Sequence, residues 1–201
     1  MPVKAWLCLI LSLQLLAGCA SQAPKDPARQ NWEEHHAQLE QLSRWIATGK
    51  LALHTTERSE AASMLWQQDG ENTRLQLSGP IGFNAMIVTS DGRSMAMRQG
   101  DTVRAWDISS PGAIARATGW DLPLQALPYW LRGMPFPGMA VQSLEIAPDT
   151  ALLQALRQDD WDVLYEKYGQ FDTTSLPTRL RIQRGDTSAK VIIRDWKTPD
   201  A

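Results

Sequence analysis

Cys19 is the residue whose type and spacing point most directly to chemistry. It ends the stretch Leu16-Ala17-Gly18-Cys19, which follows a largely apolar run from Trp6 to Leu16 and one basic residue, Lys4. This is the order of a lipoprotein signal peptide, in which small residues admit the peptidase and the cysteine thiol forms a thioether with a diacylglyceryl group. The run is too short for the ~20 residues that cross a bilayer. We therefore expect a signal peptide over 1–18 and a lipid on Cys19; the alternative is an ordinary secretory signal whose cysteine is incidental.

The residues after Cys19 indicate where the protein is held. Ala20, which is not Asp, favours the outer membrane by similarity to bacterial sorting rules. Two prolines and the lack of apolar periodicity in 19–30 predict a lipidated flexible tether, and 31–201 has the length of one domain. Cys8 falls in the signal peptide, so we expect no intramolecular disulfide. The prediction is a lipid-anchored protein in the outer membrane that faces the periplasm.

Other residues that could do chemistry do not form a recognisable catalytic pattern. The sequence has no G-x-S-x-G, H-E-x-x-H, C-x-x-C or phosphate-loop motif, so it indicates no enzyme, no cofactor and no ATP. The adjacent His35 and His36 diverge by about 100° on a helix, which favours solvent-exposed histidines over a metal site. Asp159 and Asp160 are typical turn formers, although two neighbouring carboxylates could also act as an acid and a base.

The charge balance excludes a nucleic-acid surface. Once Lys4 leaves with the signal peptide, 19 basic residues face 22 acidic ones in the remaining 183 of 201 residues. This part of the chain contains no run of eighteen apolar residues, so the lipid would be its only firm membrane attachment. We expect a monomer that binds no nucleic acid.

The elements begin with a helix and continue with strands. Asn31 and Glu34 resemble a capping box, and apolar residues at helical spacing predict a helix from about Trp32 to Arg44. From Gly49 the apolar period becomes 2, which predicts a meander of six strands with turns at Asp69-Gly70, Asp91-Gly92 and Gly100-Asp101. Its alternating positions are Leu51/Leu53, Ala62/Met64/Trp66, Thr73/Leu75/Leu77, Met86/Val88, Met95/Met97 and Val103/Ala105.

A helical insert separates this meander from the remaining strands. Ser110-Pro111 predicts a helix that ends at Gly119, and Pro123 predicts a second that ends at Gly133, with a kink or broken turn at Pro128. Strands are then expected over 141–146, 152–157, 161–168, 178–184 and 188–196, although 152–157 also has helical propensity. About eleven antiparallel strands favour a mainly β fold, an unclosed barrel with the helices as a lid over its concave face.

The strand faces are unusually rich in large apolar residues. Nine tryptophans and seven methionines allow two interpretations, a well-filled core or a pliable cavity for an apolar ligand. If a cavity exists, its expected lining is Leu51, Leu53, Met64, Trp66, Leu75, Leu77, Met86, Val88, Met95 and Met97.

One loop carries apolar residues where a hairpin connection is normally polar. Gly79, Pro80, Ile81 and Gly82 precede Phe83, and an exposed Ile forgoes about 1.5–3 kcal/mol of burial. Ile81 therefore either folds back onto the core or meets an apolar partner outside the protein.

Taken in order, these motifs resemble the LolB family of outer-membrane lipoproteins over nearly the whole chain after the signal peptide. The matching stretches are Leu-Ala-Gly-Cys19, the helix ending near Trp45, Trp66-Gln67-Gln68-Asp69-Gly70, Gly79-Pro80-Ile81-Gly82, Thr118-Gly119, Leu122-Pro123-Leu124 and the final Asp195-Trp196. The resemblance implies an unclosed eleven-strand barrel with a helical lid, and it implies that Trp66, Trp130 and Trp161 lie near an acyl-binding cavity. It makes Gly79, Pro80, Ile81 and Gly82 a membrane-insertion loop, with Ile81 where the family usually has Leu.

The resemblance also implies a function and partners. The protein would accept acylated lipoproteins from the periplasmic carrier LolA and insert them into outer-membrane lipid without ATP. A structural or assembly lipoprotein of the outer membrane is the alternative, since it would share the signal peptide and the β-rich body but need no cavity.

Overall fold

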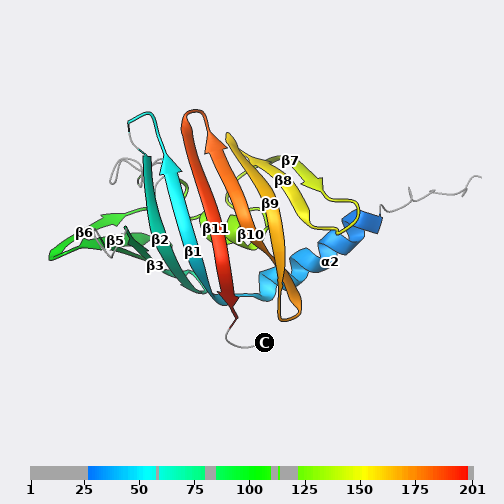
Figure 1. Cartoon of the computed structure of the whole chain (residues 1–201), viewed down its shortest axis with the longest axis horizontal. Coiled ribbons are helices and arrows are strands. Elements are labelled where there is room, and N and C mark those ends of the chain that lie inside the picture. The colour runs from blue at the N-terminus through cyan, green and yellow to red at the C-terminus, as the bar shows by residue number, and fades with distance from the viewer. Residues whose placement is uncertain (1–26, 58, 80–84, 110–112, 114–121, 199–201) are drawn as a thin grey trace, which may run out of the picture.

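Eleven antiparallel strands form one sheet in the computed structural model, which describes residues 27–57, 59–79, 85–109, 113 and 122–198. Neighbouring strands run in the order β6-β5-β4-β3-β2-β1-β11-β10-β9-β8-β7 (Figure 1). The strands are β1 (Arg44–His54), β2 (Ser59–Asp69), β3 (Asn72–Ser78), β4 (Met86–Ser90), β5 (Ser94–Gln99), β6 (Thr102–Asp107), β7 (Val141–Ile146), β8 (Leu153–Gln158), β9 (Trp161–Phe171), β10 (Thr174–Arg184) and β11 (Thr187–Lys197).

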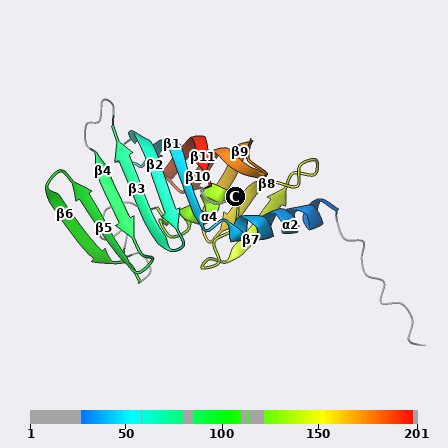
Figure 2. The same ribbon diagram turned by 90° about the horizontal axis from the view of Figure 1, so that it is seen from below.

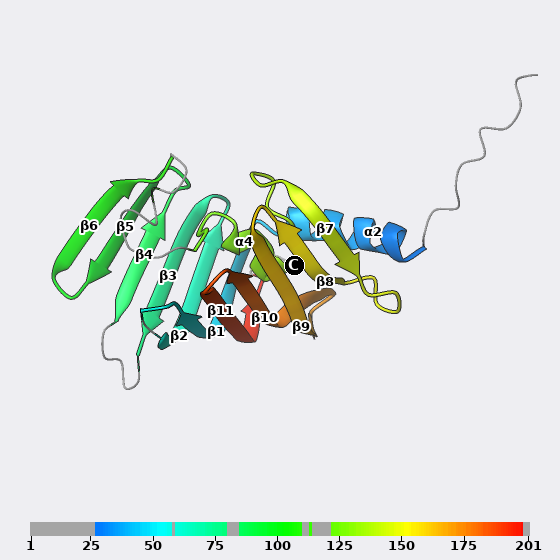
Figure 3. The same cartoon turned by 90° about the horizontal axis from the view of Figure 1, so that it is seen from above.

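The sheet is a pair of meanders joined between β1 and β11. Each strand from β1 to β6 pairs with the next along the chain, as does each strand from β7 to β11. Strands β6 and β7 are the two edges, and Figures 2 and 3 show the sheet curved so that these edges stand apart. This confirms the mainly β, unclosed antiparallel fold that the sequence predicts.

Alternation and turn residues explain most of the sheet. Trp66 pairs with Leu75, and Leu75 pairs with Val88, so their side chains share the concave face. The three predicted turns of the meander join β2 to β3, β4 to β5 and β5 to β6. Residues 153–158 are a strand, and Asp159 has a φ of 48° in the turn between β8 and β9, where left-handed backbone suits a turn.

A bulge at Gly49 interrupts the pairing of β1 with β11. The register shifts between Thr48 and Gly49, and a Cβ on residue 49 would collide with the carbonyl of Ile192. Only glycine allows the two backbones to approach this closely, and a bulge of this kind increases the local twist. Gly49 therefore marks a bend near the centre of the sheet.

Helix α2 (Pro27–Gln41) begins earlier and ends earlier than the sequence predicts. The capping-box interpretation of Asn31 and Glu34 is wrong, because both lie inside the helix. Residues 27–30, part of the expected tether, are helical. These residues carry no apolar stripe, so periodicity placed the start too late. Among residues 31–41 of the helix, Trp32 and Leu39 are buried.

Helix α4 (Leu127–Arg132) lies inside the curve of the sheet (Figure 3). It starts at Leu127, four residues after Pro123, and Pro128 lies in its first turn. A backbone N–H in the first turn has no acceptor within the helix, so the missing N–H of proline costs no hydrogen bond there. The helix expected from Pro123 therefore has no kink at Pro128; instead residues 124–126 form a turn, and the helix begins only at Leu127. Gly133 ends it with a φ of 86°, as predicted. No helix in the described part of the chain is long and apolar enough to cross a membrane.

Several predictions fall on residues outside the described ranges. These are the signal peptide, Cys19, the tether residues before Pro27, and Pro80, Ile81 and Gly82 of the predicted insertion loop. The helix predicted from Ser110 to Gly119 also lies outside, except for the buried Ala113.

Candidate functional site

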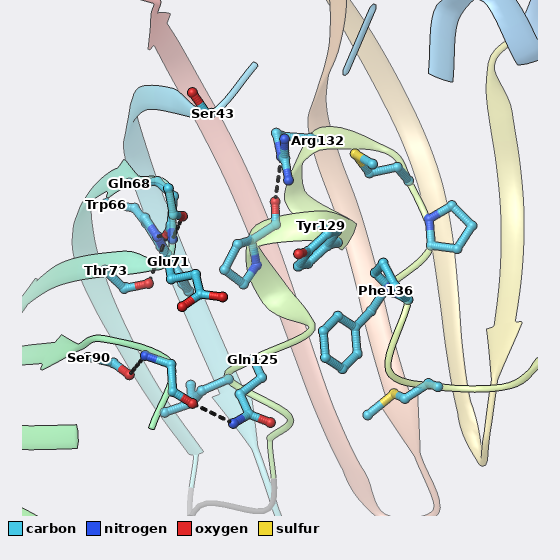
Figure 4. Close-up of a pocket in the computed structure, with 18 of the residues that line it drawn as sticks. Ser43, Trp66, Gln68, Glu71, Thr73, Ser90, Gln125, Tyr129, Arg132 and Phe136 are labelled. Carbon is cyan, nitrogen blue, oxygen red and sulfur yellow. Dashed lines mark hydrogen bonds between the residues drawn. The ribbon is translucent and has the colours of Figure 1, made fainter. Parts of the chain in front are cut away.

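A cavity of about 1070 Å³ lies between the concave face of the sheet, α2, α4 and the segment that follows α4. Its volume is just above the ~300–1,000 Å³ range of sites for small molecules. On the sheet side, strands β1 to β5 line it with Trp45, Trp66, Gln68, Thr73, Leu75, Val88, Ser90 and Met95. Opposite them are side chains from α2, α4, the following segment and β7, including Trp32, His36, Glu40, Pro128, Tyr129, Arg132, Met134, Phe136, Met139, Val141 and Leu144 (Figure 4).

Four of the predicted lining residues border this cavity: Trp66, Leu75, Val88 and Met95. Six others on the same sheet do not, namely Leu51, Leu53, Met64, Leu77, Met86 and Met97. The difference follows the strand direction. Leu75 and Val88 lie toward the turns at Gly70 and Gly92, whereas the six lie toward the other end of their strands. Of those six, Leu53, Met64 and Leu77 are buried and the rest are partly buried against the core.

Trp130 and Trp161 are core residues, which corrects the prediction that they lie at the cavity. Their exposed fractions are 0% and 1%, and their ring centroids are 6.1 Å apart. Neither borders the cavity. Trp130 instead fixes α4 to the sheet, because its Nε1 donates to Oε1 of Gln158 at 2.8 Å.

Gln158 holds one wall of the cavity in place. It is fully buried at the end of β8, and its Oε1 also accepts from the backbone N–H of Phe136 at 2.8 Å. Its Nε2 donates to the carbonyls of Phe136 and Met139, at 2.8 and 3.0 Å. Both lone pairs and both N–H groups of the amide are thus used, and such a saturated buried network is rigid. The segment carrying Phe136 and Met139 is therefore a fixed wall.

A second glutamine organises the polar rim between β2 and β3. Oε1 of Gln68 accepts from Trp66 Nε1 and from the Thr73 hydroxyl, both at 2.9 Å, and its Nε2 donates to the Gly70 carbonyl at 2.9 Å. Figure 4 shows Gln68, Thr73 and Trp66 grouped in this way. The indole of Trp66 is thereby held against the cavity.

Arg132 places a cation at the cavity wall. Nε donates to the Pro128 carbonyl at 3.0 Å, and Nη1 donates to the carbonyls of Leu39 and Leu42 at 2.9 and 2.8 Å. The guanidinium thus ties α4 to the C-terminal end of α2, where a positive charge is favourable. It also lies 5.2 Å from the centre of the Tyr129 ring. Burial lowers the pKa of Arg132, and the nearby Tyr129 and Glu40 partly oppose this.

The two neighbouring histidines of α2 have different surroundings. His36 borders the cavity and stacks on Trp32, with ring centroids 4.9 Å apart. His35 faces the backbone of Ser175 in β10, and burial lowers its pKa more than the hydrogen bond to Ser175 raises it. Within the described ranges, no group of three or more His, Cys, Asp or Glu residues could hold a metal ion.

The lining of the cavity suits an amphiphile. Aromatic and aliphatic side chains form most of the wall, while Arg132 and Gln68 supply hydrogen-bonding groups. Sequence reasoning missed Arg132, Gln158, Met134, Phe136 and Met139 as parts of the site. The signal available for Arg132 was a polar residue at the end of an otherwise apolar segment, whereas Gln158 stands among polar residues and gave no such signal.

The chain matches a family model described as "Outer membrane lipoprotein LolB" over residues 43–196. Relatives include the outer-membrane lipoprotein LolB of Chromohalobacter salexigens, 34% identical over 96% of this chain and 90% of the relative. The LolB of Alkalilimnicola ehrlichii is 33% identical over 92% of this chain and 93% of that protein.

Solved structures share the fold at low identity. The superposition on a DUF1329 family protein from Desulfovibrio piger covers 88% of this chain and 95% of that protein, with a TM-score of 0.54 and 12% sequence identity. A LolA superfamily protein from Nitrosomonas europaea covers 86% and 94%, with a TM-score of 0.51 and 12% identity. The family resemblance seen in the sequence is thus confirmed, and the chain belongs to the non-enzymatic LolB family of outer-membrane lipoproteins.

Proposed function

We propose that the protein takes the acyl chains of lipoproteins from the periplasmic carrier LolA into its cavity and passes them to the outer membrane. The observation that supports this most is the cavity itself, a space of about 1070 Å³ with a largely apolar wall. Membership of the LolB family supports a role in lipoprotein localisation at that membrane. A structural lipoprotein would not need such a space.

The physical chemistry of the cargo explains why a cavity is needed. A sixteen-carbon chain in water costs on the order of 12 kcal/mol at ~0.8 kcal/mol per methylene, so acylated cargo cannot cross the periplasm free. The cargo would pass from one apolar site to the next. Because a ligand shifts an equilibrium only through differential affinity, this cavity would bind cargo more tightly than the carrier does, and the bilayer more tightly still.

Displacement of a fluorescent fatty acid tests the cavity directly. Leu75→Asp would place an unpaired charge on the wall and should weaken probe binding strongly. Leu164→Asp, at a β9 side chain that is 46% exposed, makes the same change away from the cavity and should leave binding unchanged. If the unmodified protein shows no saturable binding, the structural-lipoprotein alternative is favoured.

We further propose that the lipid on Cys19 anchors the domain, which rests on the Leu16–Cys19 pattern. Cys19→Ala should then block lipoprotein-type processing. Mass spectrometry that finds a normally cleaved and acylated Cys19→Ala chain would contradict this assignment.

Ile81 is proposed as the residue that enters the bilayer during insertion, because Gly79, Pro80 and Gly82 flank an aliphatic side chain in a short loop. Ile81→Asp should reduce transfer of cargo into liposomes while receipt from the carrier persists, and Ile81→Leu should be nearly neutral. Loss of folding or of receipt in Ile81→Asp would instead make Ile81 a core or cavity residue.

A further inference from the structure

Arg132 is a buried cation beside an apolar cavity. Its exposed fraction is 7%, and its neighbours on the wall include Tyr129 and Met134. No carboxylate lies within salt-bridge distance of it among the residues that the structure describes. A buried charge is costly unless its hydrogen bonds are made, so the partners of each N–H group matter.

Three of the five guanidinium N–H groups are occupied by backbone carbonyls. Nε uses one on Pro128, and the two on Nη1 go to Leu39 and Leu42. The two N–H groups of Nη2 have no hydrogen-bond partner in the described part of the chain. A guanidinium has no acceptor capacity, so these two donors can bind oxygen atoms only of water or of a ligand in the cavity.

The surroundings favour a neutral carbonyl oxygen as the missing acceptor. Arg132 already makes all three of its hydrogen bonds to carbonyl oxygens, and the Tyr129 ring lies beside it. The Glu40 carboxylate is near enough to raise the pKa of Arg132, so a second anion at this place would be repelled by it. Figure 4 shows Arg132 and Ser43 toward one end of the lining, with Ser90 and Gln125 toward the other. A chain with a polar head at Arg132 could therefore extend along the apolar wall.

We propose that Arg132 is the polar subsite of the acyl cavity, where Nη2 donates to the ester or amide carbonyl at the head of a bound acyl chain. This rests on the proposed function, since it requires an acyl ligand. The cavity would then recognise acyl groups as such and not merely hydrocarbon. A hydrogen bond to a charged donor would favour an acyl ligand over its ether analogue about tenfold.

A matched pair of lipids tests the assignment in the unaltered protein. Dioctanoylglycerol and its dioctyl ether have chains of equal length and differ in the two ester carbonyl oxygens. Each would be titrated against a bound fluorescent fatty acid, and the ester should displace the probe at about tenfold lower concentration. Equal displacement by the two lipids overturns the proposal while leaving the acyl cavity intact. If neither lipid displaces the probe, the proposed function fails, and this inference fails with it.

Variants then assign the preference to a residue. Arg132→Gln should bring the ester-to-ether ratio close to one, whereas Arg157→Gln, at an exposed residue paired with Asp162, should keep it. The ratio is insensitive to a general loss of stability, because both lipids bind only the folded protein and its amount is the same in the two titrations. A ratio that persists in Arg132→Gln overturns the proposal and points to the indole N–H groups of Trp32 and Trp45. Both groups are buried, have no hydrogen-bond partner among the described residues, and belong to residues that border the same cavity. If Arg132→Gln does not fold, the comparison of the two lipids on the unaltered protein still decides whether the carbonyl is recognised.

Discussion

The concave face of the sheet is open to a cavity over one half of its strands and covered by packed side chains over the other half. On β3 and β4, Leu75 and Val88 border an open cavity. On β9 and β10, Val163 and Leu180 do not border it, and neither does Trp130 of α4, although all of these residues belong to one buried cluster. The side chains on the two sides are of the same kind and are similarly buried.

The difference shows that a short helix, rather than the strands, decides where the cavity lies. Trp130 and Gln158 hold α4 against β8 and β9, and this occupies the space in front of those strands. The face of β2 to β5 that lies toward the turns at Gly70 and Gly92 is left open. We refer to these two regions as the packed side and the cavity side.

Removing the anchor of α4 should have the largest effect. Trp130→Ala deletes a fully buried ring and the donor to Gln158, and we expect it to lower the free energy of unfolding by about 3–5 kcal/mol. Denaturant unfolding would measure this. Trp106→Ala, at a partly buried residue of the edge strand β6, should cost clearly less. Equal losses would mean that α4 does not hold the packed side together.

Enlarging an inward side chain should have the second largest effect, and it should distinguish the packed side from the cavity side. Val163→Phe would overpack the packed side and cost about 1–3 kcal/mol of stability. Val88→Phe makes the same change where a cavity can accept it, so it should cost less stability but weaken fatty-acid binding. Thermal unfolding and probe titration would measure both effects. A Val88→Phe variant that is as unstable as Val163→Phe and still binds the probe normally would contradict the comparison.

Acidification should loosen the contact of α2 with the packed side. Burial lowers the pKa of His35 below 6.5 in the folded protein, so the unfolded chain binds the proton more readily. The stabilisation that neutral His35 contributes is complete above pH 6.5, the ordinary pKa of the unfolded chain. It declines as the pH falls below 6.5 toward the lower pKa of the folded state. His35→Gln should flatten this part of a stability–pH profile, whereas His36→Gln, which removes only the smallest of the causes that shift the pKa of His35, should flatten it less. A slope that survives in His35→Gln would assign it to another group.

The smallest effect should appear at a turn on the rim of the cavity side. The carboxylate of Asp91 accepts from the backbone N–H groups of Arg93 and Ser94, which lowers its pKa to about 2. These bonds persist above the ordinary pKa of 3.8 and weaken as the pH falls toward 2. The amide resonance of Ser94 should report a midpoint near 2, and Asp91→Asn should abolish the titration. A midpoint near 4 would show that the turn does not hold the carboxylate.

Sequence reasoning predicted the strands well because their signals are local. Alternation placed Leu75 and Val88 on one face, and turn residues such as Asp69-Gly70 set the hairpins. It could not separate the cavity side from the packed side, since an inward apolar residue looks the same whether a helix or a ligand covers it. The family resemblance placed Trp130 near the cavity, although it fills the core.

Two buried polar side chains of the site were overlooked. Arg132 ends an otherwise apolar helix, whereas Gln158 ends a strand that also contains Gln154 and Arg157, and buried polar groups need specific partners. Those partners, such as Phe136 for Gln158 and Leu39 for Arg132, are distant in the sequence. Only the tertiary arrangement reveals them.

The unpaired edges β6 and β7 have a mechanical consequence. In a closed barrel, the ladder of inter-strand hydrogen bonds fixes the circumference, so the interior cannot widen without breaking bonds. Here the described edges do not pair with each other, and the bulge at Gly49 bends the sheet near its middle. A small change of curvature can therefore alter the width of the interior while every strand keeps its hydrogen-bonded neighbours. We expect the protein to be compliant in this one direction, which would let a single cavity accept cargo with acyl chains of different length and number.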